Sequence, residues 1–289
     1  MTVLGILHPG SMGAAVAAQA KNSGARVLWC PTGRSAASRK RAEEYGLEPV
    51  AALRELSEQA DIVLSICPPA HAEEVAAAVA AQSFSGLYVD GNAVSPAAMR
   101  RIAETVSGAG ATVVDGAVVG SPPTGSKSPR LYAAGPGDAL ARVTALFKRS
   151  TVRVHELPGA VGQASALKLS YSSYQKASRA LAAVSYALAA EHGVEEDLLD
   201  IARGRASSYL AETEYFPKTA ARAWRWAPEM EEVARALDEA ELPSELATAA
   251  AAVMERWGAL RDKPMTVEQA LATLHTPMST EGVELESKG

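Results

Sequence analysis

One candidate for proton-transfer chemistry is Lys168, which lies in a stretch otherwise rich in alanine and leucine. The polar residues of this stretch recur at the spacing of one face of an α-helix. They are Lys168, Tyr171, Ser172 and Gln175. An ammonium group partly removed from water can have a lowered pKa and can then exchange a proton with an oxygen on which charge develops. The spacing indicates either a catalytic face with a lysine acid or base, or a solvated polar face.

A second candidate site follows the apolar run Val3–Leu7, where a short turn contains two glycines. Its residues are His8, Pro9, Gly10, Ser11, Met12 and Gly13. A strand, a tight turn and the first turn of a helix, in this order, hold the pyrophosphate of a dinucleotide on backbone N–H groups. The usual first glycine is replaced by His8, but Gly10 still permits close approach of a phosphate, and Gly13 permits close packing of helix on strand. The turn therefore predicts dinucleotide binding.

The end of the next predicted strand, Arg26–Cys30, indicates which dinucleotide. An NAD site commonly has an Asp or Glu about 20 residues beyond the glycines, but here no acidic residue occurs until Glu43. In its place stand Arg34, Ser35 and Arg39, which can hold a 2′-phosphate by charge-assisted hydrogen bonds. We therefore expect NADP (NADPH) rather than NAD. The alternative for these basic residues is the outer face of a solvated helix.

Three further turns follow predicted strands at the edge where ligands bind in parallel sheets. The turn with Cys67, Pro68 and Pro69 can pack along the cofactor. The turn with Asn92 can bridge nicotinamide and substrate. The third turn has small residues that leave room for substrate. The segment Asp115–Pro123 is expected to be this third turn. Ordinary turn chemistry is the alternative for all three. The candidate residues in these turns are Cys67, Pro68, Pro69, Asn92, Gly120 and Ser121.

Short strands alternate with helical stretches up to about Glu156, and several strands are apolar throughout, as expected where helices cover both faces of a sheet. The expected strands are Val3–Leu7, Arg26–Cys30, Asp61–Ile66, Gly86–Asp90, Ala111–Asp115, Leu131–Ala134 and Val152–His155. After Pro158 the pattern becomes helical, beginning with one long helix from about Val161 to Glu191. We therefore expect an α/β fold: an N-terminal Rossmann-type, doubly wound sheet (residues 1–157), then an all-α C-terminal domain (residues 158–289) begun by a long interdomain helix. A polar tail is expected from about Pro277.

The composition excludes several classes of protein. The chain has 289 residues, of which 48% are hydrophobic, and a net charge of −5, so it gives no reason to expect nucleic acid or an anionic membrane as partner. Its two cysteines form neither a disulfide framework nor a metal-ligand set, and they fit a reducing cytoplasm. The longest apolar stretch, about Ala180–Ala190, is too short to span a bilayer. We expect a cytoplasmic protein with a small-molecule substrate and no metal.

These motifs resemble those of the β-hydroxyacid dehydrogenase superfamily, which includes 6-phosphogluconate dehydrogenase, 3-hydroxyisobutyrate dehydrogenase and, as relatives, imine reductases. The resemblance covers about residues 3–195 well. Gly5–Gly13 resembles the family's G-F-I-G-L-G-x-M-G turn, and Arg34-Ser35 resembles its N-R-[ST] step. Asp115–Gly120 resembles its D-A-P-V-S-G substrate loop, and Gly159–Lys168 resembles its G-x-x-G-x-G-x-x-x-K helix. The family's lysine is the catalytic acid or base, so the resemblance implies that role for Lys168. It also implies a homodimer through the helical domain, where Trp224-Arg225-Trp226 can line either the interface or a pocket.

Three positions depart from the family pattern. Ser172 replaces an asparagine, and Val119 replaces the serine of the substrate loop. Gln175 replaces a glutamate of the phosphogluconate enzymes, so phosphogluconate is not the expected substrate. We expect an NADP-dependent oxidoreductase that moves hydride between nicotinamide and a C–OH/C=O carbon of a small organic acid or related metabolite. In this interpretation Lys168 transfers the proton, Asn92 and Ser121 position the substrate, and Tyr171 assists. The alternatives are an imine reductase with Tyr171 as proton donor, and a non-catalytic NADP-binding sensor.

Overall fold

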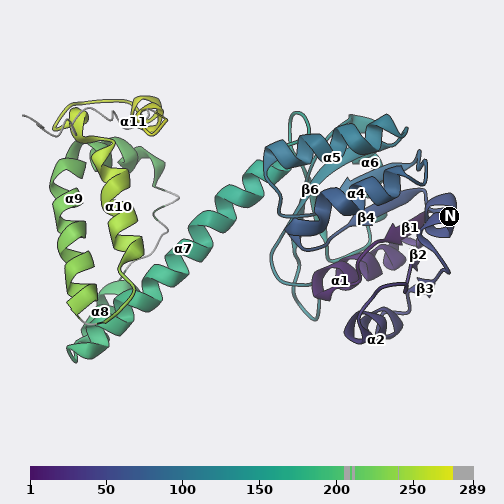
Figure 1. Cartoon of the computed structure of the whole chain (residues 1–289), viewed down its shortest axis with the longest axis horizontal. Coiled ribbons are helices and arrows are strands. Elements are labelled where there is room, and N and C mark those ends of the chain that lie inside the picture. Colours follow the sequence, from purple (N-terminus) through teal and green to yellow (C-terminus); the bar gives the residue numbers. More distant parts are fainter. Residues whose placement is uncertain (205–208, 210–211, 240, 276–289) are drawn as a thin grey trace, which may run out of the picture. The chain divides into compact units, whose positions relative to one another are not determined.

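The computed structural model describes residues 1–204, 209, 212–239 and 241–275 of the chain. It divides into two compact units, Met1–Ser172 (unit 1) and Ser173–Gly289 (unit 2), shown in Figure 1. The polar tail expected from Pro277 lies outside the described residues.

Unit 1 contains an eight-stranded sheet in the order β3-β2-β1-β4-β5-β6-β7-β8. All neighbouring strands in it are parallel except β6 and β7. The strands are β1 (Val3–Ile6), β2 (Arg26–Trp29), β3 (Glu48–Pro49), β4 (Ile62–Ser65), β5 (Leu87–Asp90), β6 (Thr112–Val119), β7 (Arg130–Ala134) and β8 (Arg153–Glu156). The chain runs from β1 outward to β3 and then returns to β4 on the other side of β1. In open parallel sheets, ligands bind at the carboxyl ends of the strands where the strand order reverses, and the glycine turn lies at this point, after β1.

Helices cover both faces of this sheet, which confirms the predicted Rossmann-type fold. One buried cluster joins the sheet to α1 and α6 through Val16 and Val143. The cluster on the other face includes Leu56 of α3, Val79 of α4 and Ile102 of α5. The helical elements of unit 1 before α7 are α1 (Ser11–Ala20), η1 (Lys21–Ser23), α2 (Ala36–Glu44), α3 (Leu53–Gln59), η2 (Pro69–His71), α4 (Ala72–Ala80), α5 (Pro96–Gly108) and α6 (Gly137–Leu146).

The expectation that Asp115–Pro123 forms a turn after the fifth strand is wrong for its first five residues. Strand β6 continues to Val119, because its second half pairs antiparallel with β7, from Asp115 opposite Ala134 to Val119 opposite Arg130. Gly120, with a φ of +122°, ends the strand in a conformation that favours glycine. Gly120 and Ser121 therefore follow the strand, whereas Asp115 lies inside it.

The long helix α7 (Gln163–Glu191) begins in unit 1 and continues into unit 2. The other helical elements of unit 2 are α8 (Glu195–Arg203), η4 (Thr213–Tyr215), α9 (Phe216–Glu239), α10 (Glu245–Glu255), η5 (Gly258–Leu260) and α11 (Val267–Thr273). Helices α9 and α10 lie side by side (Figure 1). Trp257 is buried in a cluster with residues of α9 and α11 and donates its indole N–H to the carbonyl of Ala270 at 2.9 Å. The described part of unit 2 is helical, as predicted.

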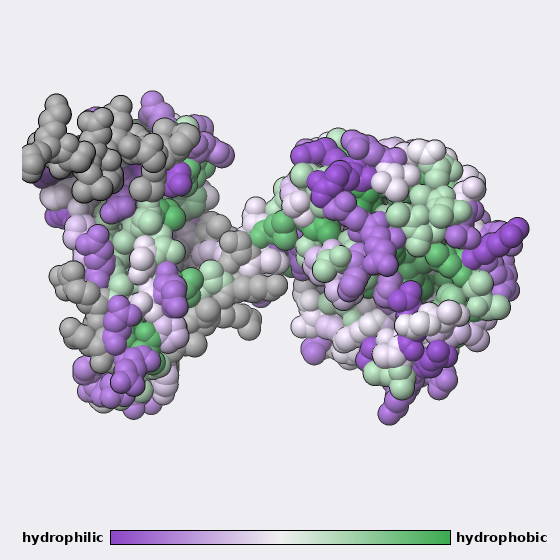
Figure 2. Space-filling model, in the orientation of Figure 1, coloured by the Kyte–Doolittle hydropathy of each residue, from purple (hydrophilic) through white to green (hydrophobic). Residues whose placement is uncertain are grey.

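The visible surface of unit 1 mixes hydrophilic side chains with apolar areas (Figure 2). Within the described residues, none of the helices combines the length and the apolarity that crossing a membrane requires.

Candidate functional site

The glycine turn brings the start of α1 to the carboxyl end of β1. Gly10 precedes the helix, and no side chain caps its first turn, so the backbone N–H groups there remain suited to an anion. A Cβ atom added to Gly10 would meet nothing within 4 Å, whereas one added to Gly13 would overlap the carbonyl oxygen of His8. Gly13 therefore allows α1 to pack closely on the turn, and Gly10 leaves open space beside it.

His8 lies half-buried in this turn, and its Nδ1 atom is buried without a hydrogen-bond partner. Burial, together with the nearby charges of Arg34 and His71, lowers the pKa of His8 to about 4. The imidazole is therefore neutral at physiological pH. An anion bound against it would favour the protonated form instead.

The predicted 2′-phosphate residues follow β2. Arg34 is partly buried, and its Nε atom is buried without a hydrogen-bond partner. Ser35 caps α2 by accepting the backbone N–H of Ser38 at 3.2 Å. Arg39 is exposed and donates from Nε to the carbonyl of Arg34 at 3.3 Å. The unsatisfied Nε of Arg34 fits an anionic group, because a buried guanidinium N–H without an acceptor is otherwise costly.

Arg41 was not among the predicted site residues, although it contacts the glycine turn. Its Nε atom donates to the carbonyl of Pro9 at 3.2 Å and its Nη2 to Ser38 Oγ at 3.3 Å. The contact ties α2 to the turn after β1. The basic run Arg39–Arg41 was a signal in the sequence, but the direction of each side chain depends on how α2 packs.

The turns after β4 and β5 are joined by Asn92, which is 2% exposed. Its amide nitrogen donates to Ser65 Oγ and Asp90 Oδ2, each at 3.0 Å, and its Oδ1 accepts the backbone N–H of Cys67 at 2.6 Å. Both amide hydrogens therefore have acceptors inside unit 1. For Asn92 to contact nicotinamide and substrate as predicted, its side chain would have to replace one of these hydrogen bonds with a bond to the ligand.

Burial also perturbs two titratable groups of this network. It raises the pKa of Asp90 to about 6, against the opposing effect of the hydrogen bonds from Asn92. It raises the pKa of the Cys67 thiol to about 11, so this thiol is protonated at neutral pH. Cys67 is thus suited to line a cofactor site rather than to act as a nucleophile. Pro68 and Pro69, predicted to lie along the cofactor, are exposed next to it.

Asp115 fixes the start of α7. Its fully buried carboxylate accepts the backbone N–H groups of Gly162 at 2.8 Å and Ser165 at 3.1 Å, and the Ser165 hydroxyl at 2.7 Å. A carboxylate at a helix N-terminus also interacts favourably with the helix dipole. Ala164, in the same turn, packs on Ala117 of β6 and Ala134 of β7. The first turn of α7 is therefore held on the β6–β7 ladder.

This anchoring places Lys168 at the carboxyl end of β6. Its Nζ atom donates to the carbonyl of Val118 at 2.7 Å, and the side chain is partly buried. Gly120 and Ser121 lie exposed just beyond that strand end. Tyr171, which is 37% exposed, follows one helical turn later. The structure thus brings Lys168 to the predicted substrate loop.

The remaining residues of the predicted polar face divide between the two units. Ser172 is the last residue of unit 1 and is partly buried, whereas Gln175 belongs to unit 2. In unit 2, the Trp224 ring lies 3.7 Å from the Arg261 guanidinium, and its indole N–H donates to Asp262 at 3.4 Å. Trp224 therefore packs against the segment that leads to α11.

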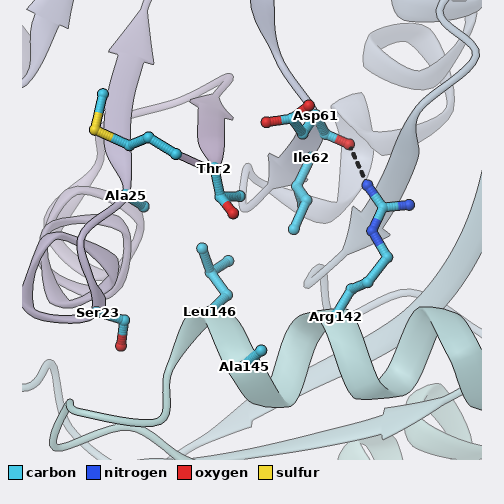
Figure 3. Close-up of a pocket in the computed structure, with 9 residues that line it drawn as sticks. Thr2, Ser23, Ala25, Asp61, Ile62, Arg142, Ala145 and Leu146 are labelled. Atoms are coloured by element: carbon cyan, nitrogen blue, oxygen red, sulfur yellow. Dashed lines mark hydrogen bonds between the residues drawn. The ribbon is translucent and has the colours of Figure 1, made fainter.

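A pocket of about 550 Å³ lies at the opposite edge of the sheet, at the amino ends of β1, β2 and β4. There the guanidinium of Arg142 points to the backbone carbonyl of Asp61, to which it donates at 2.9 Å (Figure 3). Ligands of open parallel sheets bind at the carboxyl ends of the strands, so this pocket is separate from the candidate site. Among the described residues there is no group of three or more His, Cys, Asp or Glu side chains that could hold a metal ion.

Comparison with protein families gives two matches. Residues 3–157 match the NAD binding domain of 6-phosphogluconate dehydrogenase. Residues 189–257 match a domain of unknown function, DUF1932. The first match covers the sheet with its glycine turn, and the second covers most of the helical part.

Individual proteins give more distant similarities. An uncharacterized 28.5 kDa protein from Methanothermus fervidus is 27% identical over 175 residues, which are 61% of this chain and 66% of that protein, so the chain matches just under two thirds of its length. The reductive aminase from Aspergillus terreus, solved in complex with NADPH and ethyl levulinate, is 19% identical with a TM-score of 0.71, covering 94% of this chain and 99% of the aminase. The 3-hydroxyisobutyrate dehydrogenase from Mycobacterium tuberculosis is 18% identical with a TM-score of 0.61, covering 96% and 100%. At these identities the two solved structures show a shared fold.

Proposed function

This chain belongs to the family of the NAD-binding domain of 6-phosphogluconate dehydrogenase and is an NAD(P)-dependent dehydrogenase or reductase. We propose a more specific activity within this class. The protein is an NADP-dependent oxidoreductase that transfers hydride between nicotinamide and a C–OH/C=O carbon of a small organic acid or related metabolite. The observation that carries this proposal is the position of Lys168, whose Nζ atom is held at the carboxyl end of β6 by the carbonyl of Val118.

The cofactor would be held by two groups of residues. The uncapped start of α1 after Gly10 offers N–H groups to the pyrophosphate. Arg34, with its unsatisfied buried Nε, and Arg39 offer positive charge to a 2′-phosphate. The residues after β2 include no carboxylate before Glu43 that would repel such a dianion. The NADPH bound by the similar aminase supports the same preference.

When bound, the nicotinamide supplies or accepts the hydride. Lys168, as an ammonium, donates a proton to the oxygen of the carbonyl carbon that is reduced. As a neutral amine it takes the proton from an alcohol that is oxidised, so charge and protons balance in both directions. The carbonyl of Val118 orients the amine, and Asp115 fixes the helix on which it lies. The protein thereby fixes the proton donor relative to the sheet edge.

A test of this chemistry compares Lys168→Ala with Lys40→Ala, an exposed lysine on α2. Purified variants are assayed with NADP(H) on hydroxy acids, keto acids and cyclic imines, and NADPH binding is measured separately. We expect Lys168→Ala to lower kcat by about 100-fold or more, because a positioned general acid or base usually accelerates a reaction by at least this factor. The NADPH affinity should not change. Tight NADPH binding without turnover on any substrate would instead indicate a sensor.

The cofactor preference has its own test. We expect Arg34→Ala and Arg39→Ala to weaken NADP binding while NAD binding stays the same, with Lys40→Ala as control. Loss of a charge-assisted hydrogen bond of this kind costs roughly a factor of 10 to 100 in affinity. An unchanged NADP/NAD ratio in both variants would show that the 2′-phosphate lies elsewhere.

An imine reductase is the second candidate, and the location of Tyr171 favours it. The tyrosine is accessible, lines a pocket and lies one helical turn after Lys168. The fold is also similar to that of the imine reductase from Bacillus cereus BAG3X2, with a TM-score of 0.74. This candidate predicts that Tyr171→Phe abolishes reduction of cyclic imines while Lys168→Ala retains it, the reverse of the pattern expected for carbonyl chemistry.

We also propose that the protein is a homodimer through unit 2. An apolar groove of about 620 Å³ runs along α7 and α8, and Ile201 on its rim is 75% exposed. Exposed apolar grooves of this kind often mark protein interfaces. Sedimentation should show a dimer that Ile201→Asp dissociates, whereas a monomeric wild type would contradict the proposal. The two cysteines, Cys30 and Cys67, are free thiols, which supports a reducing compartment such as the cytoplasm.

A further inference from the structure

Two arginines lie next to each other in the sheet close to the strand end that holds Lys168. Arg130 of β7 and Arg153 of β8 are in-register partners, and side chains of in-register parallel neighbours project from the same face. Like charges placed opposite each other on a ladder destabilise it. Within the described part of the chain, neither guanidinium forms an ion pair with a carboxylate. Among the described residues, the two positive charges therefore have no carboxylate partner.

The bonds that these arginines do make are to hydroxyl groups. Arg130 donates from Nη1 to the hydroxyl of Tyr132 at 3.3 Å, and Arg153 donates from Nε to Ser128 Oγ at 3.4 Å. A guanidinium has five N–H donors and can bind a carboxylate with two parallel hydrogen bonds. Most donors of Arg130 therefore remain available to a ligand.

Arg130 also faces a pocket of about 310 Å³ that lies wholly within unit 1. Its walls come from the β6–β7 hairpin and from the first turns of α7. Apolar surface combined with a few polar groups is typical of small-molecule sites. The lining residues are Val119, Ser128, Arg130, Tyr132, Leu167 and Tyr171.

The register of the sheet places this pocket beside Lys168. Arg130 is the ladder partner of Val119, and the carbonyl of the preceding residue, Val118, accepts the Lys168 ammonium at 2.7 Å. Neighbouring strands are about 4.8 Å apart, so the carbonyl that accepts the Lys168 ammonium and the backbone of Arg130 occupy adjoining positions of one hairpin. Val119 offers no side-chain donor to a substrate, whereas the guanidinium across the ladder from it does.

We propose that Arg130 is a specificity-determining residue that binds the carboxylate of a small hydroxy or oxo acid whose reacting oxygen lies at Lys168. This inference rests on the proposed function, because it assigns the substrate class of the same site. Arg153 adds a second positive charge on the same face, and Tyr171 closes the pocket from the helix. The substrate is thereby restricted to anions that are small enough to occupy about 310 Å³.

The test compares an acid with its neutral isostere, 3-hydroxypropanoate with 3-hydroxypropanamide. The variants are Arg130→Gln, the charge-retaining Arg130→Lys, and Arg149→Gln as a control, an exposed arginine on the segment before β8. KM and kcat are measured with NADP, binding of both compounds is measured by calorimetry, and thermal unfolding checks that each variant is folded. We expect Arg130→Gln to weaken binding of the acid by about 10- to 100-fold, with kcat changed much less. Binding of the amide should not change, Arg130→Lys should restore part of the affinity, and Arg149→Gln should behave as wild type.

The proposal is overturned if wild type does not discriminate between acid and amide, or if Arg130→Gln weakens both equally. Failure of the proposed function would be visible separately. A wild type that binds no NADPH, or a Lys168→Ala variant with full turnover, refutes the proposed reaction. Calorimetry with the acid alone would still show whether Arg130 binds a carboxylate.

Discussion

The carboxylate of Asp115 in β6 and the hydroxyl of Ser165 in α7 are 2.7 Å apart, although 50 residues separate them in the chain. The same carboxylate accepts the backbone N–H groups of Gly162 and Ser165. Lys168 follows Ser165 by three residues, so it lies nearly one helical turn from this anchor. The position of the proposed catalytic amine therefore depends on a buried carboxylate in the neighbouring strand.

Replacement of Asp115 should loosen that helix start. Asp115→Ala leaves the donors of Gly162 and Ser165 without their acceptor in a buried place, and we expect the free energy of unfolding to fall by about 3 to 5 kcal/mol. Asp138→Ala, an exposed acidic residue in the first turn of α6, should cost less than about 1 kcal/mol. Urea denaturation gives the stabilities, and hydrogen exchange of residues 162–172 shows whether the loosening is local. Unchanged exchange in Asp115→Ala would contradict this account of the anchor.

The two glycines of the turn after β1 should respond in opposite ways to a methyl group. Gly13→Ala forces its Cβ onto the carbonyl oxygen of His8, so we expect a loss of stability of about 1 to 3 kcal/mol. Gly10→Ala has space for its Cβ and a φ of −69°, which alanine adopts readily. Its melting temperature should stay near that of wild type, while NADPH affinity falls by about tenfold because the pyrophosphate approaches this backbone. If a folded Gly10→Ala variant binds NADPH with normal affinity, the pyrophosphate does not bind at this turn.

His8 gives a pH dependence whose sign follows from its lowered pKa. In the folded protein the pKa is about 4, against an ordinary value of 6.5, so between these values the unfolded chain binds more protons. The contribution of His8 to stability is therefore lost as the pH falls from about 6.5 towards 4. Melting temperatures measured at pH 7.5 and pH 5 should differ less in His8→Gln than in wild type. His275→Gln, which alters an exposed histidine of unit 2, should leave the difference unchanged.

Much of the fold follows from local patterns. The glycine turn between an apolar run and an alanine-rich helix predicts β1 and α1, and the face with Lys168 and Tyr171 predicts a helix with a chemical role. These features are encoded within a few residues, because strand and helix periodicities and turn glycines are local properties. The two-residue strand β3 (Glu48–Pro49) is too short to show any periodicity, and the sequence did not predict it.

The side-chain partners of the site depend instead on packing. Asp115 resembled part of a substrate loop, but the pairing of β6 with β7 places it inside a strand, where it binds the start of α7. Asn92 stood in a turn suited to a ligand, but its amide is directed to Ser65 and Asp90. Arg130 lies just before the predicted strand Leu131–Ala134, and only the register with Val119 places it near Lys168. Such contacts join distant segments, so no local pattern reports them.

The buried network around Asn92 yields a last prediction, which combines charge and pH. The amide nitrogen of Asn92 donates to Asp90 Oδ2 at 3.0 Å, so Asn92→Asp would place a second carboxylate oxygen against that of Asp90 in a buried site. Two such carboxylates cannot both ionise without a large cost, and we expect a loss of about 3 kcal/mol at pH 7. Asn22→Asp, in the exposed η1 turn, should change stability by less than about 0.5 kcal/mol.

Acidification should then rescue the Asn92→Asp variant. Burial already raises the pKa of Asp90 to about 6, and a neighbouring carboxylate raises it further, so the folded variant takes up a proton at a pH where the unfolded chain does not. Its stability relative to wild type must therefore rise as the pH is lowered from 7 towards 5. Asn92→Ala removes a hydrogen bond that lowers the Asp90 pKa but adds no charge, so its stability deficit should shrink much less over this range. Urea unfolding of the three proteins at pH 7, 6 and 5 measures these differences. Parallel pH curves for Asn92→Asp and Asn92→Ala would show that water, and not the protein, surrounds this pair of side chains.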